Sequence, residues 1–176
     1  MRGRNGALLT AALIALLVAA LLAVRNRDIG DLVAERGFSG IARVVDGDSL
    51  EIGNRRVRLF GVDAPELDQY CLDPQGQEYA CGERARAALR RLVGEHPVQC
   101  LREGRDRFGR VLARCTSASG EELNTALVRT GWAVAYAGAD GNAYRRIERE
   151  AQRARAGLWT GSFTRPEQWR RSEAPR

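Results

Sequence analysis

The feature that most constrains the fold is a β-hairpin pattern in the segment SLEIGNRRVRLF. Two runs of strand-forming residues flank Gly53-Asn54, a dipeptide typical of a tight hairpin turn. In the second run Val57 and Leu59 alternate with charged residues, so one face of the strand can line a core. If the turn has two residues, Ser49 lies opposite Arg58. The segment therefore predicts an antiparallel strand pair with one buried face.

Further elements are predicted on both sides of this hairpin. Strand patterns occur before it, at IARVV, and after it, at PVQCL and RVLARC. Apolar residues recur at helical intervals in three segments, GERARAALRRLVGEH, GEELNTALVRTG and NAYRRIEREAQRARAGLW. Five short strands, with one helix between the third and fourth and two after the fifth, suit a Greek-key barrel. We therefore expect an α+β fold with a mainly β core, namely a five-stranded OB-fold barrel capped by about three helices. An α/β sandwich is the alternative.

The beginning of the chain is apolar enough to enter a membrane. Residues Gly6–Val24 carry no charge, and a helix of this length spans roughly 28 Å, close to the thickness of a bilayer core. We expect residues 1–24 to be a transmembrane signal anchor, with a cleaved signal peptide as the alternative. A linker at 25–37, a folded domain at 38–160 and a C-terminal tail at 161–176 would follow.

Four cysteines follow the apolar segment: Cys71, Cys81, Cys100 and Cys115. An even number of cysteines after such a segment predicts two disulfides in an oxidising compartment. Of the three pairings, Cys71–Cys81 with Cys100–Cys115 is favoured, because each pair flanks a turn. Zinc is disfavoured, since no CxxC occurs and His96 is the single histidine. We expect an exported protein, anchored with its domain on the periplasmic or extracellular side, or secreted if the signal is cleaved.

Acidic residues occur at two predicted strand ends. Asp46 and Asp48 lie in the turn DGDS, and Asp63 and Glu66 lie in RLFGVDAPE. Pro65 restricts the backbone there, so we expect the two acidic side chains beside it to be held rigidly. Close carboxylates repel unless a cation or an arginine neutralises them, and oxygen ligands without histidine or thiolate favour Ca²⁺ or Mg²⁺. Ordinary turns and a salt bridge are the simpler interpretation.

Two arginines are also candidate site residues, one beside these carboxylates and one at the start of another predicted strand. Arg58 precedes the acidic loop in RLFGVDAPE, and Arg110 ends the charged turn RDRFGR. A guanidinium fixed at such a position can offer two parallel hydrogen bonds to a phosphate. The whole chain carries a net charge of +6, which is compatible with a polyanionic partner.

Four motifs, in this order, resemble the thermonuclease or staphylococcal-nuclease-like (SNase) family: VVDGDSLEI, RLFGVDAPE, DRFGR and LNTALVRTGWAVAY. The resemblance covers about residues 38–160, and the cysteine-bearing segment is similar to that of exported bacterial members. It implies the helix-capped OB barrel and a calcium-dependent nuclease that hydrolyses phosphodiester bonds in DNA, RNA or both. Internal and terminal bonds are both candidate targets, and the protein is expected to be a monomer without an obligate protein partner.

The resemblance also implies a metal site. By similarity, Asp48 and Asp63 would be Ca²⁺ ligands, with the main-chain carbonyl of Ala64 as a third. Asp46 would support the loop from behind the ligands. Some family members have threonine in place of Ala64, which matters little if only the carbonyl binds the metal.

The remaining implied residues are catalytic. Glu66 would be the general base acting on a water near the metal, and Arg58 and Arg110 would clamp the phosphate. Phe108 stands where tyrosine is frequent in the family, so one hydroxyl near the substrate is missing. Two other functions are alternatives, a non-catalytic OB module that binds nucleic acid or protein and a membrane-tethered structural protein. The presence of both arginines and the glutamate favours the enzyme.

Overall fold

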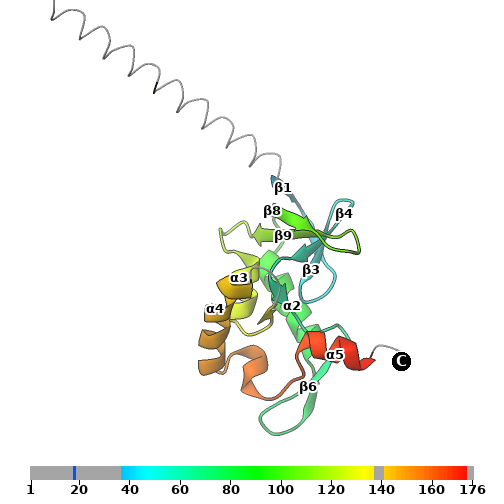
Figure 1. The fold of residues 1–176 in the computed structure, drawn as a ribbon, viewed down its shortest axis with the longest axis vertical. Helices are drawn as coiled ribbons and strands as arrows, with labels where there is room; N and C mark the ends of the chain where they lie inside the picture. The colour runs from blue at the N-terminus through cyan, green and yellow to red at the C-terminus, as the bar shows by residue number, and fades with distance from the viewer. Residues whose placement is uncertain (1–17, 19–36, 137–140, 174–176) are drawn as a thin grey trace, which may run out of the picture. The chain divides into compact units, whose positions relative to one another are not determined.

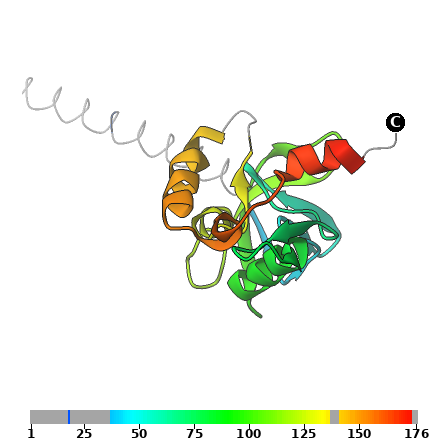
Figure 2. The same ribbon diagram turned by 90° about the horizontal axis from the view of Figure 1, so that it is seen from below.

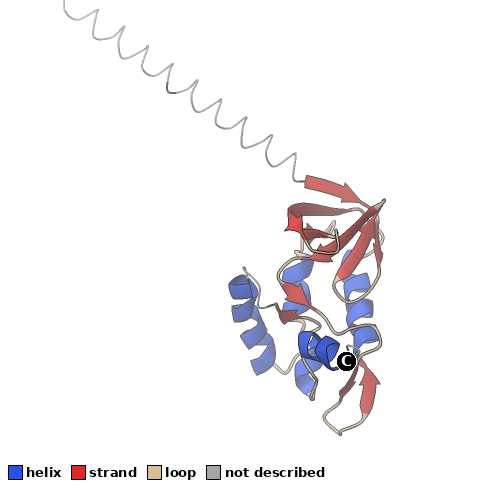
Figure 3. Cartoon of the chain, turned by 45° about the vertical axis from the view of Figure 1, so that its right-hand side comes forward, coloured by secondary structure: helices blue, strands red, loops and turns tan. Residues whose placement is uncertain are grey.

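The two outer strands of the main sheet are consecutive along the chain. The computed structural model describes residue 18, residues 37–136 and residues 141–173, and its main sheet has six strands in the order β1-β8-β9-β4-β3-β2 (Figure 1). Its edges are therefore β1 (Gly37–Gly40) and β2 (Ala42–Val44), although a single residue connects them. One residue can join opposite edges only when a sheet curls round on itself. The main sheet is accordingly nearly closed and barrel-like (Figure 3).

The predicted hairpin is present as β3 (Ser49–Ile52) and β4 (Arg55–Leu59). The two strands pair antiparallel with Ser49 opposite Arg58, which confirms the register expected from a two-residue turn. Gly53 in this turn has a φ of 59°, a conformation that glycine adopts without steric cost.

Two further strands complete the central part of the sheet. β4 pairs in parallel with β9 (Val111–Thr116), and β9 pairs antiparallel with β8 (Val98–Arg105). The disulfide Cys100–Cys115 joins residues directly opposite each other on β8 and β9. The second disulfide, Cys71–Cys81, is also the one favoured from the sequence.

Two small sheets lie outside the main one. β5 (Val62–Asp63) pairs antiparallel with β10 (Val134–Ala135), and Val134 lies opposite Asp63. β6 (Tyr70–Leu72) and β7 (Glu78–Ala80) form the second, which precedes the first helix of the domain. The first of these pairs fixes the backbone of the acidic loop predicted from the sequence.

Helices pack against the barrel-like sheet (Figure 1). The described residues contain α2 (Cys81–Val93), α3 (Leu123–Arg129), α4 (Gly141–Arg153), the 3₁₀ helix η1 (Gly157–Thr160) and α5 (Pro166–Glu173). The predicted inner face of α2 is buried, with Ala85 and Leu89 in the core beneath the sheet. Burial of such apolar surface is the main stabilising contribution to the domain.

The structure corrects the expected number of elements. It has six strands in the main sheet instead of five, two additional small sheets, and a further helix, α5, in the segment expected to be a tail. β1, the additional strand of the main sheet, has the sequence GFSG with a single large apolar residue, and the strands of the small sheets have only two or three residues, so none shows a clear period of two. α5 is too polar to show an apolar stripe. The expected N-terminal membrane helix lies almost wholly outside the described residues. Within the described part of the chain, no helix combines the length and apolar character needed to cross a membrane.

Candidate active site

The turn between β2 and β3 carries the first predicted acidic motif. The Asp46 carboxylate accepts a hydrogen bond from the Asp48 N–H (3.0 Å), which closes the turn. A Cβ on Gly47 would lie 2.6 Å from the Cβ of Ala64, so glycine is needed for the turn to approach the acidic loop. The turn therefore brings Asp48 against residues that lie more than a dozen positions later in the chain.

Arg58 lies between the carboxylates of Asp48 and Asp63. It donates one hydrogen bond to Asp48 (Nη1 to Oδ1, 2.8 Å) and another to Asp63 Oδ1. The other oxygen of Asp48 accepts the N–H of Ala64 (2.9 Å). Both aspartates are buried, with exposed fractions of 3 % and 1 %. The structure thus brings Arg58 together with the three predicted metal ligands and with Asp46, the predicted support behind them.

Burial dominates the electrostatics of this cluster. Burial raises the pKa of Asp48 to about 7; Arg58 opposes the rise, and the negative charges of Asp46 and Asp63 add to it. For Arg58, burial acts to lower the pKa, but the two adjacent carboxylates outweigh it and the pKa is raised. Arg58 therefore stays charged beside the two buried aspartates.

The donor chemistry of the cluster fits a hard cation. Asp48, Asp63 and the carbonyl of Ala64 supply oxygen atoms alone, which is the preference of Ca²⁺ and Mg²⁺. The described residues include no group of three or more His, Cys, Asp or Glu side chains arranged to hold a metal. A cation here would depend on two carboxylates, a carbonyl and water, and its affinity should be modest, with a Kd of ~10⁻⁴–10⁻³ M by analogy with extracellular calcium modules.

Glu66 is positioned by a tight turn and a close helix. Its N–H donates to the side-chain oxygen of Gln69 (3.2 Å), and the Gln69 N–H donates to the Glu66 carbonyl (2.9 Å). Gln69 is fully buried, and its side-chain amide donates to the carbonyl of Thr164 (2.7 Å). Gln69 was not predicted from the sequence, because a glutamine in a loop carries no pattern that predicts burial.

Arg170 of α5 also enters the cluster. It donates to both oxygens of Asp63 (3.0 Å each) and to Oε1 of Glu66 (2.6 Å). Burial alone would lower the pKa of Arg170, but its hydrogen bonds to these two carboxylates raise it. Sequence analysis missed this residue as well, since the pair Arg170-Arg171 in a polar tail resembles an ordinary solvated segment.

Arg110 is the one predicted catalytic residue outside these contacts. Its Nε donates to the Asp106 carboxylate (2.6 Å), within the turn before β9. Val111 is in register with Val57 on the adjacent strand, so alternation places Arg58 and Arg110 on the same face of two neighbouring strands. The structure thus brings the two arginines to one face without a recorded contact between Arg110 and the carboxylates.

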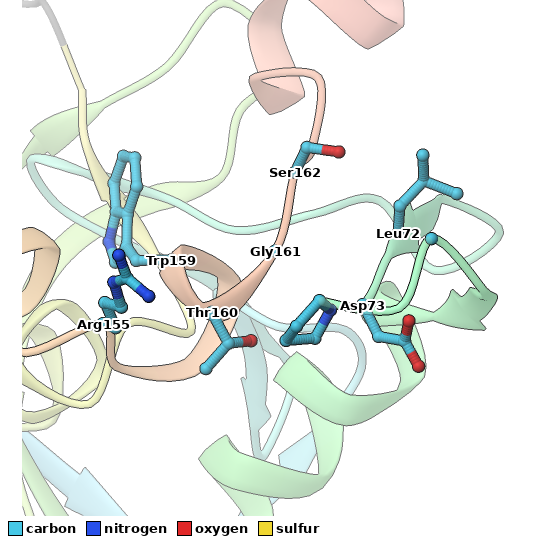
Figure 4. Close-up of a pocket in the computed structure, with 9 residues that line it drawn as sticks. Leu72, Asp73, Arg155, Trp159, Thr160, Gly161 and Ser162 are labelled. Atoms are coloured by element: carbon cyan, nitrogen blue, oxygen red, sulfur yellow. The ribbon is translucent and has the colours of Figure 1, made fainter.

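Two hollows were compared with this site. One of about 540 Å³ lies between the loop after β6 and η1, with Arg155 and Trp159 on one side and Asp73 on the other (Figure 4). It contains none of the predicted site residues. A smaller hollow of about 280 Å³ lies between β10 and α5 and is bordered by Asp63 and Gln168. The smaller hollow is therefore the one that adjoins the carboxylate cluster.

A barrel-like sheet that presents carboxylates and arginines at one hairpin end is suited to binding a metal ion together with a phosphate group. Comparison with known proteins identifies the class. Residues 56–161 match the staphylococcal nuclease homologue family, and the chain belongs to this family. Asp46 and Asp48 precede the matched range.

Individual relatives agree with this assignment. The chain is 35 % identical over 149 residues to a micrococcal nuclease of Shigella flexneri, covering 75 % of this chain and 79 % of the relative. It is 32 % identical over 146 residues to an uncharacterized endonuclease of Haemophilus influenzae, covering 79 % and 76 %. It is 38 % identical over 130 residues to the succinoglycan biosynthesis protein ExoI of Rhizobium meliloti, covering 73 % and 68 %. The protein is a thermonuclease-like nuclease, which confirms the resemblance seen in its motifs.

Proposed function

We propose that this nuclease is a calcium-dependent phosphodiesterase that hydrolyses DNA, RNA or both. The observation that carries the proposal is the position of Arg58 between two buried aspartates, Asp48 and Asp63. Glu66 follows Asp63 by three residues on the same loop. Asp48, Asp63 and the Ala64 carbonyl would hold the calcium ion. When bound, the ion would supply positive charge that lowers the pKa of a nearby water and offsets charge on the phosphate.

Glu66 is the proposed general base. Its carboxylate is about one-third exposed, so a water molecule can reach it, and its backbone is held by Gln69. The carboxylate would accept a proton from the water that attacks the phosphorus atom. General-base catalysis of this kind contributes about 10²–10⁴-fold to a rate.

Arg58 and Arg110 are the proposed phosphate clamps. As the phosphodiester is attacked, negative charge increases on its non-bridging oxygens, and fixed guanidinium groups stabilise that charge. The recorded hydrogen bond of Arg110 to Asp106 uses Nε, so this ion pair can orient the guanidinium while its terminal nitrogens face a phosphate. Arg58 now binds both aspartates through its terminal nitrogens. A cation on those aspartates would weaken these bonds and let Arg58 turn to the phosphate.

We also propose that the protein is exported. The apolar segment at residues 1–24 would anchor or direct it, residues 25–37 would be the linker, and an OB-type nuclease domain at 38–160 would lie outside the cytoplasm as a monomer. The two disulfides support this proposal, because such bonds persist in oxidising compartments. Calcium is abundant outside cells, which suits a site with few carboxylate ligands.

The test is cleavage of single-stranded DNA and of RNA by the oxidised full-length chain, with Ca²⁺ or with a chelator. We expect cleavage that needs Ca²⁺ and that falls by about 10²-fold or more in Glu66→Gln. Glu121→Gln is the matched control, because the Glu121 side chain pairs with Arg129 at an exposed position. Binding of nucleic acid without cleavage in any of the three proteins would instead favour the non-catalytic OB module.

A further inference from the structure

The segment that leads into α5 is attached to the domain by its own contacts. It runs from η1 across the molecule to α5 (orange to red in Figure 2). Ser162 and Leu72 exchange two main-chain hydrogen bonds (2.9 and 3.0 Å), and the Thr164 carbonyl accepts the buried amide of Gln69 (2.7 Å). These contacts hold the start of the helix beside the acidic loop whether or not Arg170 binds there.

A second attachment lies at the first turn of α5. Arg165, directly before the helix, pairs with Glu148 of α4 (2.9 Å), and Pro166 is buried. Proline at the first position of a helix is favourable, because its missing N–H has no partner within the helix. The helix is thus held at its beginning, and Arg170, about one turn further on, contacts the carboxylate cluster.

Arg170 occupies the atoms that the proposed metal and base would use. Both oxygens of Asp63 accept hydrogen bonds from it, and one of them accepts a further bond from Arg58. The same guanidinium binds Oε1 of Glu66 at 2.6 Å. A carboxylate bound in this bidentate way has fewer lone pairs left for a cation, and a guanidinium and a calcium ion repel each other.

We propose that α5 is a tethered inhibitory element in which Arg170 occupies Asp63 and Glu66 until calcium displaces it. The inference rests on the proposed assignment of Asp63 as a metal ligand and Glu66 as the base. In the closed state the guanidinium of Arg170 binds both the base, Glu66, and the metal ligand, Asp63, so the nuclease is inactive at low calcium. Calcium binding and release of α5 are then coupled: calcium favours release of the helix, and release of the helix raises the affinity for calcium.

The helix also offers a matched control residue. Arg171 is exposed and pairs with Glu167 on the same helix, one turn earlier. Arg170→Gln and Arg171→Gln therefore remove the same charge from the same element. Only the first removes the contact with the carboxylate cluster.

The first measurement is a calorimetric titration of Ca²⁺ into the oxidised full-length chain and the two variants, with detergent in all samples. We expect Arg170→Gln to bind Ca²⁺ about 5–150-fold more tightly than the wild type, which is the usual range of coupling between two sites. Arg171→Gln should bind like the wild type. Equal or weaker Ca²⁺ binding by Arg170→Gln overturns the inference.

The second measurement is hydrogen exchange of the wild-type chain with and without Ca²⁺. We expect Ca²⁺ to increase exchange in residues 166–173, because the helix loses its contact with the site. Exchange at 162–164 should change little, because those attachments do not involve the site. Unchanged or greater protection of 166–173 in Ca²⁺ overturns the inference, as this would mean that the helix stays closed over the bound metal.

Cleavage assays separate this inference from the proposed function. Tighter Ca²⁺ binding in Arg170→Gln without cleavage by any variant would support displacement by calcium and reject the nuclease mechanism. Cleavage that needs Glu66, combined with unchanged Ca²⁺ affinity in Arg170→Gln, would support the mechanism and reject the inhibitory element. A lower kcat with unchanged Ca²⁺ affinity would also reject it, and would make Arg170 a phosphate-binding residue.

Discussion

Gly82 approaches Glu66 so closely that a Cβ on Gly82 would lie 1.8 Å from the Glu66 carbonyl oxygen. The N–H of Gly82 also donates to the carbonyl of Gln69 (3.2 Å), in the turn that holds the glutamate. The first turn of α2 therefore determines where the acidic loop lies. A change in this helix should alter the site without touching any charged group.

Gly82→Ala should displace the Glu66 loop. The added methyl group meets main-chain atoms, which cannot rotate away as a flexible side chain would. We expect cleavage activity to fall by about 10-fold or more, since small misplacements of catalytic groups are costly. Gly104→Ala is the control, because its Cβ would meet nothing within 4 Å. Activity assays at saturating Ca²⁺, with melting curves, check the prediction, and equal activity in the two variants contradicts it.

Arg58→Gln should destabilise the calcium-free protein. It leaves Asp48 and Asp63 buried with less positive charge beside them, and breaking a buried ion pair typically costs about 3–5 kcal/mol of unfolding free energy. Ca²⁺ should restore part of this loss, because it neutralises the same carboxylates. Urea unfolding with and without Ca²⁺ measures both effects. Arg56→Gln, at an exposed position on the same strand, should change little; a similar loss in both variants would argue against the buried cluster.

Asn124→Ala should destabilise the domain without affecting the site chemistry. The Asn124 side chain accepts the Cys115 N–H (3.2 Å) and donates to the carbonyls of Phe60 (2.9 Å) and Ala113 (3.3 Å), so it joins α3 to β9 and to the residue that follows β4. Its removal takes this partner from the Cys115 N–H and the Phe60 carbonyl, while the Ala113 carbonyl still accepts the Phe60 N–H, and the cost should be about 1–3 kcal/mol. Urea unfolding checks this value, with Thr125→Ala as the neighbouring control. A loss of unfolding free energy no greater than that of the control would contradict the prediction and show that water replaces these bonds.

Removal of either disulfide should lower stability by a similar amount. The bonds close short loops, with sequence separations of 10 and 15 residues. Chain entropy alone gives about 3 kcal/mol for each loop. Thermal melting of Cys71→Ser/Cys81→Ser and Cys100→Ser/Cys115→Ser, each beside the wild type, measures the two contributions. Melting of the wild type that is identical with and without reductant, after the bonds are shown to be reduced, would contradict the prediction.

Local features of the chain were predictable because their causes are local. The two-residue turn at Gly53-Asn54 specifies the β3–β4 register, so the position of Ser49 opposite Arg58 followed from a few adjacent residues. The apolar period of α2 and the nearby cysteine pairs are also short-range patterns. The roles proposed for Asp48, Asp63, Glu66 and Arg110 come from motifs of the same kind, and Glu66→Gln tests the proposed base.

Short stretches of sequence were enough to predict the family, the strand pair beside the acidic loop and the residues proposed for catalysis, because periodicity, turn residues and motifs are all short-range patterns. The folded chain was needed to show that Gln69 joins this loop to the C-terminal segment and that Arg170 binds Asp63 and Glu66. These contacts connect residues 95, 107 and 104 positions apart. No short pattern encodes such a contact, because the partners of a polar side chain depend on which distant surface the folded chain brings beside it.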